Sequence, residues 1–427
     1  MAISDDVLVI GGGTAACTAA LAAARKGATT RLVANKKSTL RHASGLIDVL
    51  GYGPDGEGPL ADPYAAFDDL PDDHPYAKVG ESTVRDALAL FDEAVGDAYR
   101  GGHTDRNALL PTHGGTVKPT ARYPAGAAAG LASDERPMLV VGFRALPDFD
   151  GRMVADHLRA AGVPFEVGGA EIEFPGSFRA DARVTRYAKA LDVDESLGGV
   201  GAREALAERV KPSLDDVGDG DGAERVGFPA LLGDEHGEEV RADLSRRLGA
   251  EAFEVPAGPP SLPGLRLEDL LYDALDEAGV RISTGNPAVG YDSQGGRVTA
   301  VRVDQGRREV PYEADQYVLA TGGLVGKGLD ADREAVREPL FGCHVPAPAD
   351  RYDWFVDEAF GDQPFARFGV RVDGGMRPQT ADGRPEFANL RAAGAVLGGG
   401  DFAAEKSMSG VSLASGLVAG RTAAASL

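Results

Sequence analysis

The 427-residue sequence predicts an α/β fold: a dinucleotide-binding (Rossmann-like) domain with a parallel sheet and a β-meander, interrupted by a large α/β insertion. Three observations predict it. Residues 7–17 run from an apolar strand through three glycines into an alanine-rich helix, residues 280–323 form a meander and a buried strand ending in glycines, and a region rich in helices separates the two. We expect a flavin-binding domain built from residues 1–60 and 262–427, with residues 61–261 as the inserted α/β domain.

The glycine fingerprint carries the first part of the prediction. Gly11 permits a tight turn off the strand, Gly12 continues it, and Gly13 lets the backbone approach a pyrophosphate at the positive N-terminus of the helix. Ala16 takes the position where helix and strand pack closely, and alanine is an accepted small substitute there. These four residues are predicted to bind a dinucleotide or flavin.

The segment after the second strand, residues 30–33, departs from the usual pattern. An acidic residue often ends this strand and binds a ribose hydroxyl, whereas this sequence has Ala34 and Asn35, of which Asn35 can still form a hydrogen bond to a ribose. Ser44 and Gly45 then lie in a small, polar loop that is suited to pass under a flavin ring. An ordinary solvated loop explains the same residues equally well.

The middle of the chain alternates helices with Gly/Pro-rich connections. The pattern predicts helices at residues 82–99, 150–161, 181–191, 202–210 and 267–278, a strand at 138–142, a long loop at 101–137 and an acidic loop at 214–224. The strand and helix at 138–161 resemble a second small α/β unit, although they contain no glycine fingerprint.

The last third returns to a flavoprotein pattern. Segments at 280–283 with 289, at 298–303 and at 309–312 predict a short β-meander, and a buried strand from 314 leads into Thr321 and Gly322. Strands are also expected at 367–373 and 389–397. Gly398 and Gly399 follow the latter, and a final helix from about Gly410 to 424 presents an N-terminus that suits the N1/C2 edge of a reduced flavin.

The composition limits the class of protein. The net charge is −22, from 66 acidic and 44 basic residues, of which only nine are lysine. Acid enrichment with few lysines is typical of a halophilic cytoplasm, where salt screens self-repulsion, and it argues against nucleic-acid binding. No apolar run is long enough for a membrane helix, and we expect a cytoplasmic protein. The two cysteines, Cys17 and Cys343, predict no metal site and no iron–sulfur cluster.

Taken in order, the motifs resemble those of one family, the B-type subunits of the anaerobic glycerol-3-phosphate dehydrogenases. The resemblance spans nearly the whole chain, and the composition implies a halophilic archaeal member. It is carried by the following residues: Gly11-Gly12-Gly13, His42-Ala43-Ser44-Gly45 with Asp48, His74-Pro75-Tyr76, Gly115-Thr116, Lys118-Pro119-Thr120, Val141-Gly142, Gly322-Gly323, Arg337-Glu338-Pro339, Phe368-Gly369-Val370, Arg377-Pro378 and Leu397-Gly398-Gly399.

This resemblance implies a flavoprotein subunit that uses FMN. It would pair with a larger, FAD-containing A-type subunit and with a C-type iron–sulfur subunit at the inner face of the membrane. The complex would oxidise sn-glycerol 3-phosphate to dihydroxyacetone phosphate and pass electrons to quinone. The dinucleotide motif itself favours FAD, so FMN and FAD both remain open at this point. A fainter resemblance to fumarate reductase and succinate dehydrogenase flavoproteins places Thr39 where those proteins carry a flavin-linked histidine, which implies a non-covalent flavin.

Four functions are compatible with these residues. A catalytic role would need a base and a phosphate site, for which His42, Lys118 and Arg377, together with Arg41, are the candidates. Because these do not form a convincing constellation, an electron-relay role is favoured. A stand-alone oxidoreductase of the fumarate reductase type and an assembly scaffold are the alternatives.

Overall fold

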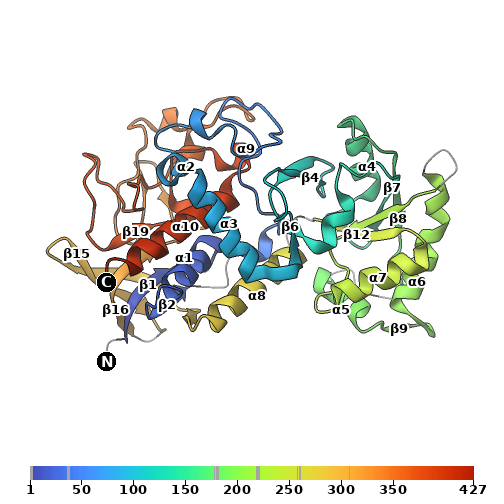
Figure 1. Cartoon of the computed structure of the whole chain (residues 1–427), viewed down its shortest axis with the longest axis horizontal. Coiled ribbons are helices and arrows are strands. Elements are labelled where there is room, and N and C mark those ends of the chain that lie inside the picture. The colour runs from blue at the N-terminus through green and yellow to red at the C-terminus, as the bar shows by residue number, and fades with distance from the viewer. Residues whose placement is uncertain are drawn as a thin grey trace. The chain divides into compact units, whose positions relative to one another are not determined.

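The computed structural model describes residues 3–35, 39–176, 178, 182–217, 222–256, 258, 261–306 and 308–427. It divides into two compact units. Unit 1 comprises Met1–Leu40, Asp48–Gly96 and Glu268–Leu427, and unit 2 comprises Arg41–Ile47 and Asp97–Leu267. In Figure 1 the blue and red ends of the chain share unit 1, while the green and yellow-green middle forms unit 2.

Unit 1 is built on a seven-stranded sheet that confirms the predicted fold class. Its parallel part follows the order β13, β2, β1 and β16, with β19 also pairing in parallel with β16, and the antiparallel strands β15 and β14 complete the meander. The bounds are β1 Ile3–Ile10, β2 Thr30–Ala34, β13 Arg281–Thr284, β14 Ala288–Gln294, β15 Arg297–Asp304, β16 Glu309–Leu319 and β19 Leu390–Ala392.

Four strand predictions for the last third need correction. The strand expected at 389–397 spans only β19, because Gly394–Val396 form a short 3-10 helix. Residues 280–283 do not begin the meander, because β13 follows a helix and pairs in parallel with the edge of β2. The segments at 309–312 and 314–319 form one long strand, β16. Residues 367–373 form no regular strand and make only isolated bridges, Val370 with Leu397 and Val372 with Pro378.

Two helices from opposite ends of the chain pack tightly on this sheet: α1 (Thr14–Ala24) and α10 (Met408–Ala424) (Figure 1). They approach closely because Gly416 and Gly420 of α10 face the backbone of α1. A Cβ at Gly416 would lie 2.6 Å from the Ala15 oxygen, and one at Gly420 would lie 2.2 Å from the Ala19 oxygen. Small residues therefore set the distance between the two helices.

Two helices of unit 1, α2 (Pro75–Val79) and α3 (Glu81–Val95), lie in residues that the sequence placed in the insertion. The remaining elements of unit 1 are α9 (Phe402–Glu405) and the short strands β17 (Asp330–Ala331) and β18 (Val336–Arg337). α2 and α3 pack on α10, so the predicted domain bound at residue 61 is wrong and residues 48–96 belong to unit 1. α3 also ends earlier than predicted, because Gly96 at its C-cap has a φ of 52°.

Unit 2 contains a four-stranded parallel sheet in the order β12–β11–β7–β8. Its strands are β7 Met138–Phe143, β8 Val167–Ile172, β11 Arg225–Pro229 and β12 Glu251–Val255, and its helices are α4 Gly151–Ala160, α5 Val184–Asp192, α6 Ala202–Val210, α7 Gly237–Leu248 and the start of α8 (Leu262–Glu277). Residues 262–267 thus lie in unit 2 and not in the flavin-binding part.

Short strand pairs complete unit 2, and part of the predicted loop at 101–137 has regular structure. β4 (Ala108–Pro111) and β5 (Val117–Thr120) form a hairpin. β3 (Tyr99–Arg100) pairs with β6 (Tyr123–Pro124). β9 (Ser196–Leu197) pairs with β10 (Val200–Gly201). In the acidic segment 214–224, residues 218–221 lie outside the described part of the chain.

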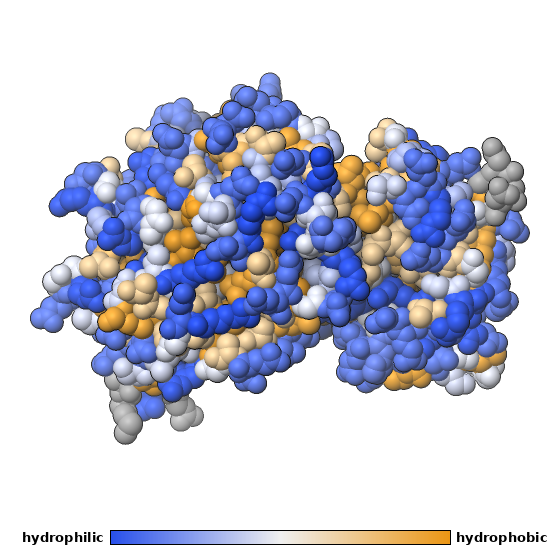
Figure 2. Space-filling model, viewed as in Figure 1, coloured by the Kyte–Doolittle hydropathy of each residue, from blue (hydrophilic) through white to orange (hydrophobic). Residues whose placement is uncertain are grey.

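The surface agrees with the acidic composition. The face in Figure 2 is mostly hydrophilic, as a net charge of −22 leads one to expect. Among the described residues, no helix is long and apolar enough to cross a lipid bilayer.

Candidate flavin site

The N-terminus of α1 follows the glycine fingerprint and is the candidate site for the pyrophosphate. β1 ends at Ile10 and the chain turns through three glycines to Gly13, which is the N-cap of α1 and has an extended backbone with a φ of −87°. No side chain among the described residues caps this helix, and its first turn contains no acid. Its backbone N–H groups and its positive dipole end therefore remain available for a pyrophosphate.

Gly11 and Gly13 serve different purposes in this turn. Gly11 has a φ of 138°, and a Cβ there would lie 2.1 Å from the Ala320 carbonyl oxygen, so the fold itself requires glycine. At Gly13 a Cβ would meet no described atom within 4 Å. The protein's own packing does not explain this second glycine, whereas close approach of a ligand does.

The end of β16 adds a polar group without a protein partner. Thr321 follows this strand, and its Oγ1 is buried with no hydrogen-bond partner among the described residues. Buried hydroxyl groups are nearly always hydrogen-bonded, so this oxygen needs a ligand or water. Gly322 beside it has a φ of 91°. Together with the open space at Gly13, Thr321 fits a bound cofactor.

The glycines after β19 have structural explanations of their own. A Cβ at Gly398 would lie 2.7 Å from the Arg367 oxygen, and one at Gly399 would lie 2.2 Å from the Asp73 oxygen. The Gly410 N–H donates to the Asp48 oxygen at 2.7 Å. This N–H, near the start of the final helix, is therefore already used within the protein. A cofactor-binding role for these three glycines stays a prediction.

Asn35, Ser44 and Gly45 lie in two different units. Asn35 is exposed at the end of β2 in unit 1. Ser44 and Gly45 belong to unit 2, where the Ser44 Oγ accepts a hydrogen bond from the Leu46 N–H at 3.3 Å and the Gly45 oxygen accepts one from the Tyr99 hydroxyl at 2.8 Å. Their predicted contact with the flavin ring also stays a prediction.

The weak catalytic candidates do not form one cluster within a unit. His42 is exposed and Lys118 lies in β5, both in unit 2, whereas Arg377 lies in unit 1. The Arg377 Nη2 is 2.7 Å from the carboxylate of Asp373, so its charge is already balanced. A phosphate-binding role for Arg377 stays a prediction.

A buried cluster surrounds His74, which belongs to the His74-Pro75-Tyr76 motif. His74 is fully buried at the N-cap of α2, and its Nδ1 accepts the Tyr76 N–H at 3.1 Å. Its other nitrogen, Nε2, thus carries the hydrogen and donates to Glu405 at 3.1 Å, and the Ser407 hydroxyl donates to the same oxygen at 2.7 Å. The cluster ties α2 to the residues that lead into α10.

The charge of this cluster resides on Glu405. Burial favours the neutral carboxyl group, but the hydrogen bonds from His74 and Ser407 outweigh it and hold the pKa of Glu405 below its usual value. A further residue, Tyr76, donates its hydroxyl to the Val49 oxygen at 2.7 Å. The cluster is therefore a structural element that fixes the loops at this edge of unit 1.

The two cysteines are unsuited to redox chemistry. Both are free and buried, and burial raises the pKa of Cys17 to about 12, with a further contribution from nearby Glu268. Burial also raises the pKa of Cys343. Among the described residues, no group of three or more His, Cys, Asp or Glu side chains is arranged to hold a metal ion.

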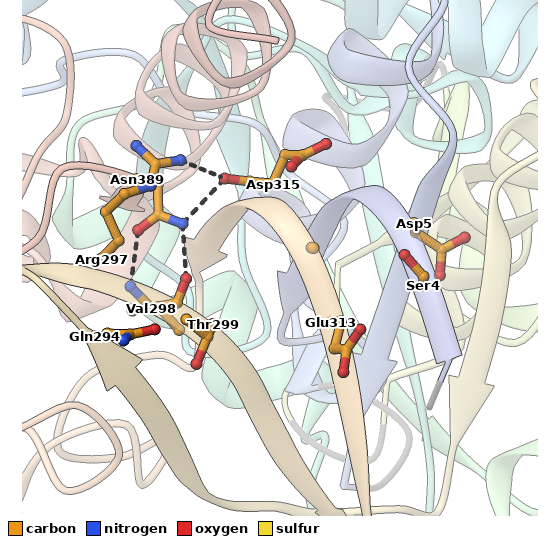
Figure 3. A pocket seen from close by; sticks show the side chains of 10 residues that line it. Ser4, Asp5, Gln294, Arg297, Val298, Thr299, Glu313, Asp315 and Asn389 are labelled. Carbon is orange, nitrogen blue, oxygen red and sulfur yellow. Dashed lines mark hydrogen bonds between the residues drawn. The ribbon is translucent and has the colours of Figure 1, made fainter. Parts of the chain in front are cut away.

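A polar pocket of about 430 Å³ lies at the other end of β1 from the fingerprint (Figure 3). Ser4 and Asp5 line it from β1, and Glu313 and Asp315 from the middle of β16. Asn389 there donates to the oxygens of Val298 and Asp315 at 2.9 and 3.0 Å. Because Gly11 and Thr321 follow the carboxyl ends of β1 and β16, this pocket is separate from the candidate flavin site.

Comparison with known proteins agrees with this geometry. A family model described as an FAD binding domain matches residues 6–413, so the chain is an FAD-binding flavoprotein. This match supports FAD, the cofactor that the motif favoured, over the FMN that the resemblance implied. The structure of a flavocytochrome c3 fumarate reductase is a distant likeness, with 12% sequence identity and a TM-score of 0.43. The alignment covers 99% of this chain and 78% of the fumarate reductase chain.

The particular family follows from closer relatives. A Halobacterium salinarum protein named as the probable B-type subunit of an anaerobic glycerol-3-phosphate dehydrogenase is 59% identical over 99% of both chains. The Vibrio cholerae protein with the corresponding name is 32% identical over 96% of this chain and 94% of its own. The chain therefore belongs to the family of B-type subunits of anaerobic glycerol-3-phosphate dehydrogenase, as the resemblance indicated, and is an oxidoreductase subunit.

Proposed function

We propose that this chain relays electrons through a non-covalently bound FAD within a complex that oxidises sn-glycerol 3-phosphate to dihydroxyacetone phosphate and reduces a quinone. The observation that carries the proposal is the uncapped N-terminus of α1 beside the open Cβ position of Gly13. The first turn of α1 would hold the pyrophosphate, and Thr321 would supply a hydroxyl group. Bound FAD would supply two-electron chemistry at its ring.

A relay is favoured over direct catalysis because Arg377, the candidate phosphate ligand of unit 1, is already paired with Asp373, and His42 of unit 2 is exposed. The partners that we propose are an FAD-containing A-type subunit and a C-type iron–sulfur subunit, which would hold the chain at the inner face of the membrane. The names of the relatives, which describe one subunit of a dehydrogenase, support a complex of this kind.

An exposed apolar segment in unit 1 also supports assembly with another chain. Between residues 352 and 365, several large side chains are well exposed: Tyr352, Phe355, Val356, Phe360 and Phe365. Phe360 is fully exposed. Exposed aromatic residues gathered on one segment are typical of a surface that a partner covers.

The test is a spectrum of the purified chain in high salt. We expect bound flavin absorbance, and release of the cofactor by denaturation without proteolysis should give the mass of FAD. Anaerobic sn-glycerol 3-phosphate should bleach the flavin only after the FAD-containing partner is added. A folded but colourless protein would rule out both the relay and the catalytic role, and bleaching of the isolated chain would replace the relay by direct catalysis.

A further inference from the structure

The exposed apolar segment of unit 1 is a folded loop, residues 350–367, which we call the apolar loop. Its two ends form the short helices η6 (Arg351–Trp354) and η7 (Pro364–Arg367), which lie against each other. Between and on them, Phe360 is fully exposed and Tyr352 is 69% exposed. The rings of Tyr352 and Phe355 meet edge to face, with centroids 6.5 Å apart. The apolar side chains are therefore gathered on one compact surface.

Hydrogen bonds within the chain hold the apolar loop in this shape. The Gln363 Oε1 accepts the Val356 N–H at 3.1 Å, and its Nε2 donates to the Glu358 oxygen at 2.7 Å. The ring N–H of Trp354 donates to the Pro348 oxygen at 2.8 Å. A surface that is already ordered loses less conformational entropy when a partner binds. The exposed rings are therefore presented ready for contact.

The border of the apolar loop is acidic. Residues 350–367 contain five acids and two arginines, all exposed, which gives a net charge of −3. One arginine, Arg367, is paired with Asp362 at 2.7 Å, so four acids remain against Arg351 alone. These four are Asp350, Asp353, Asp357 and Glu358.

This charge limits what can cover the rings. A second copy of the chain would bring two acidic borders together, and like charges at an interface are unfavourable. Anionic lipid headgroups would be repelled in the same way. A protein whose apolar groove is bordered by arginine or lysine side chains is complementary in both respects.

The apolar loop is attached to the edge of the sheet that bears the candidate flavin site. The Gly399 N–H donates to the Arg367 oxygen at 3.1 Å, and Gly399 lies beyond the carboxyl end of β19. β19 runs parallel to β16, whose carboxyl end leads into Thr321. The segments after these two strands touch, because a Cβ at Gly323 would lie 2.6 Å from the Ala395 oxygen. A chain bound to the loop would therefore lie at the edge of unit 1 that the flavin uses.

We propose that the apolar loop is the surface on which the FAD-containing partner docks, through an apolar groove bordered by basic side chains. The inference rests on the proposed function, in which that partner passes electrons to the flavin of this chain. Membership of a family of dehydrogenase subunits supports a surface that another chain covers. The iron–sulfur partner fits less well, since it would hold the acidic border close to anionic lipid headgroups.

Titration calorimetry of the full, flavin-loaded chain with the FAD-containing partner tests the surface. We expect Phe360→Ser to raise the dissociation constant about thirtyfold or more, because exposed aromatic anchors dominate binding energy. Glu358→Lys should raise it about tenfold, and this effect should shrink as salt is added. Val193→Ser is the matched control, because Val193 is 63% exposed at the end of α5 in unit 2. It should bind as wild type does, and all three variants should keep their flavin.

Unchanged affinity in Phe360→Ser, or an equal loss in Val193→Ser, would overturn the docking surface. So would a self-associating wild-type chain, or binding to the iron–sulfur partner instead, that is lost in Phe360→Ser. The outcome is separable from that of the proposed function. Flavin bleaching with the FAD-containing partner, at the same affinity in wild type and Phe360→Ser, removes the surface and keeps the relay. The expected losses of affinity without any bleaching remove the relay and keep the surface.

Discussion

Replacing Gly13 with valine is expected to abolish flavin binding while unit 1 stays folded. The position has ordinary backbone geometry and no described atom within 4 Å of its Cβ, so the apoprotein has room for the side chain. The isopropyl group would instead fill the space where a pyrophosphate must approach the N-terminus of α1. We expect flavin affinity to fall about a hundredfold or more, and the stability of the apoprotein to change by no more than about 0.5 kcal/mol.

The contrast with Gly11→Val makes this test specific. At residue 11 the Cβ of a valine would lie only 2.1 Å from the Ala320 oxygen. The backbone φ of 138° at this position is also unfavourable for any residue other than glycine. We expect this variant to lose stability by about 4 kcal/mol or more and to lose flavin as a consequence. Stoichiometric flavin in Gly13→Val, or equal destabilisation of both variants in apoprotein melts, would show that the two glycines do not have these separate roles.

The second large effect is expected from His74→Ala. The change opens a cavity in a fully buried site and removes a hydrogen-bond donor from Glu405, whose side chain is 9% exposed. Leaving a buried carboxylate with one partner fewer is expected to lower the free energy of unfolding by about 3–5 kcal/mol. Chemical denaturation of the apoprotein in constant salt measures the loss, and His74→Gln, which restores a donor, should recover part of it.

The same cluster gives stability a defined pH dependence. Because the pKa of Glu405 is lower in the folded protein than its ordinary value of 4.5, its ionised form stabilises the fold above that value. The contribution is lost as the pH falls through the folded pKa. We therefore expect the stability difference between wild type and Glu405→Gln to shrink on acidification. A difference that grows as the pH falls would contradict the assignment of the charge to Glu405.

Sequence patterns were most informative where structure depends on neighbouring residues. The strand, glycines and helix around Gly11 and Gly13 follow from one short stretch, and the meander and β16 follow from alternation and a buried apolar run. The domain bound at residue 61 failed because the amphipathic pattern of α3 shows that one face is buried but not which partner covers it. That partner, α10, lies more than 300 residues further along the chain.

Contacts between side chains far apart in the sequence could not be predicted from local patterns. Nothing next to His74 indicates Glu405, which follows it by 331 residues. The ion pair between Arg266 of α8 and Glu254 of β12 is equally absent from any local pattern.

The pairing of β1 with β16 bears on how the chain is made. Val9 lies between Leu32 of β2 and Val318 of β16, so the central strand of unit 1 obtains its second neighbour only after about three quarters of the chain has left the ribosome. Almost all of unit 2 is contiguous, from Asp97 to Leu267, and is complete before then. The apolar strand β1 therefore stays without its β16 neighbour while nearly all of unit 2 is synthesised. The packing of α10 on α1 can form only at the end of synthesis.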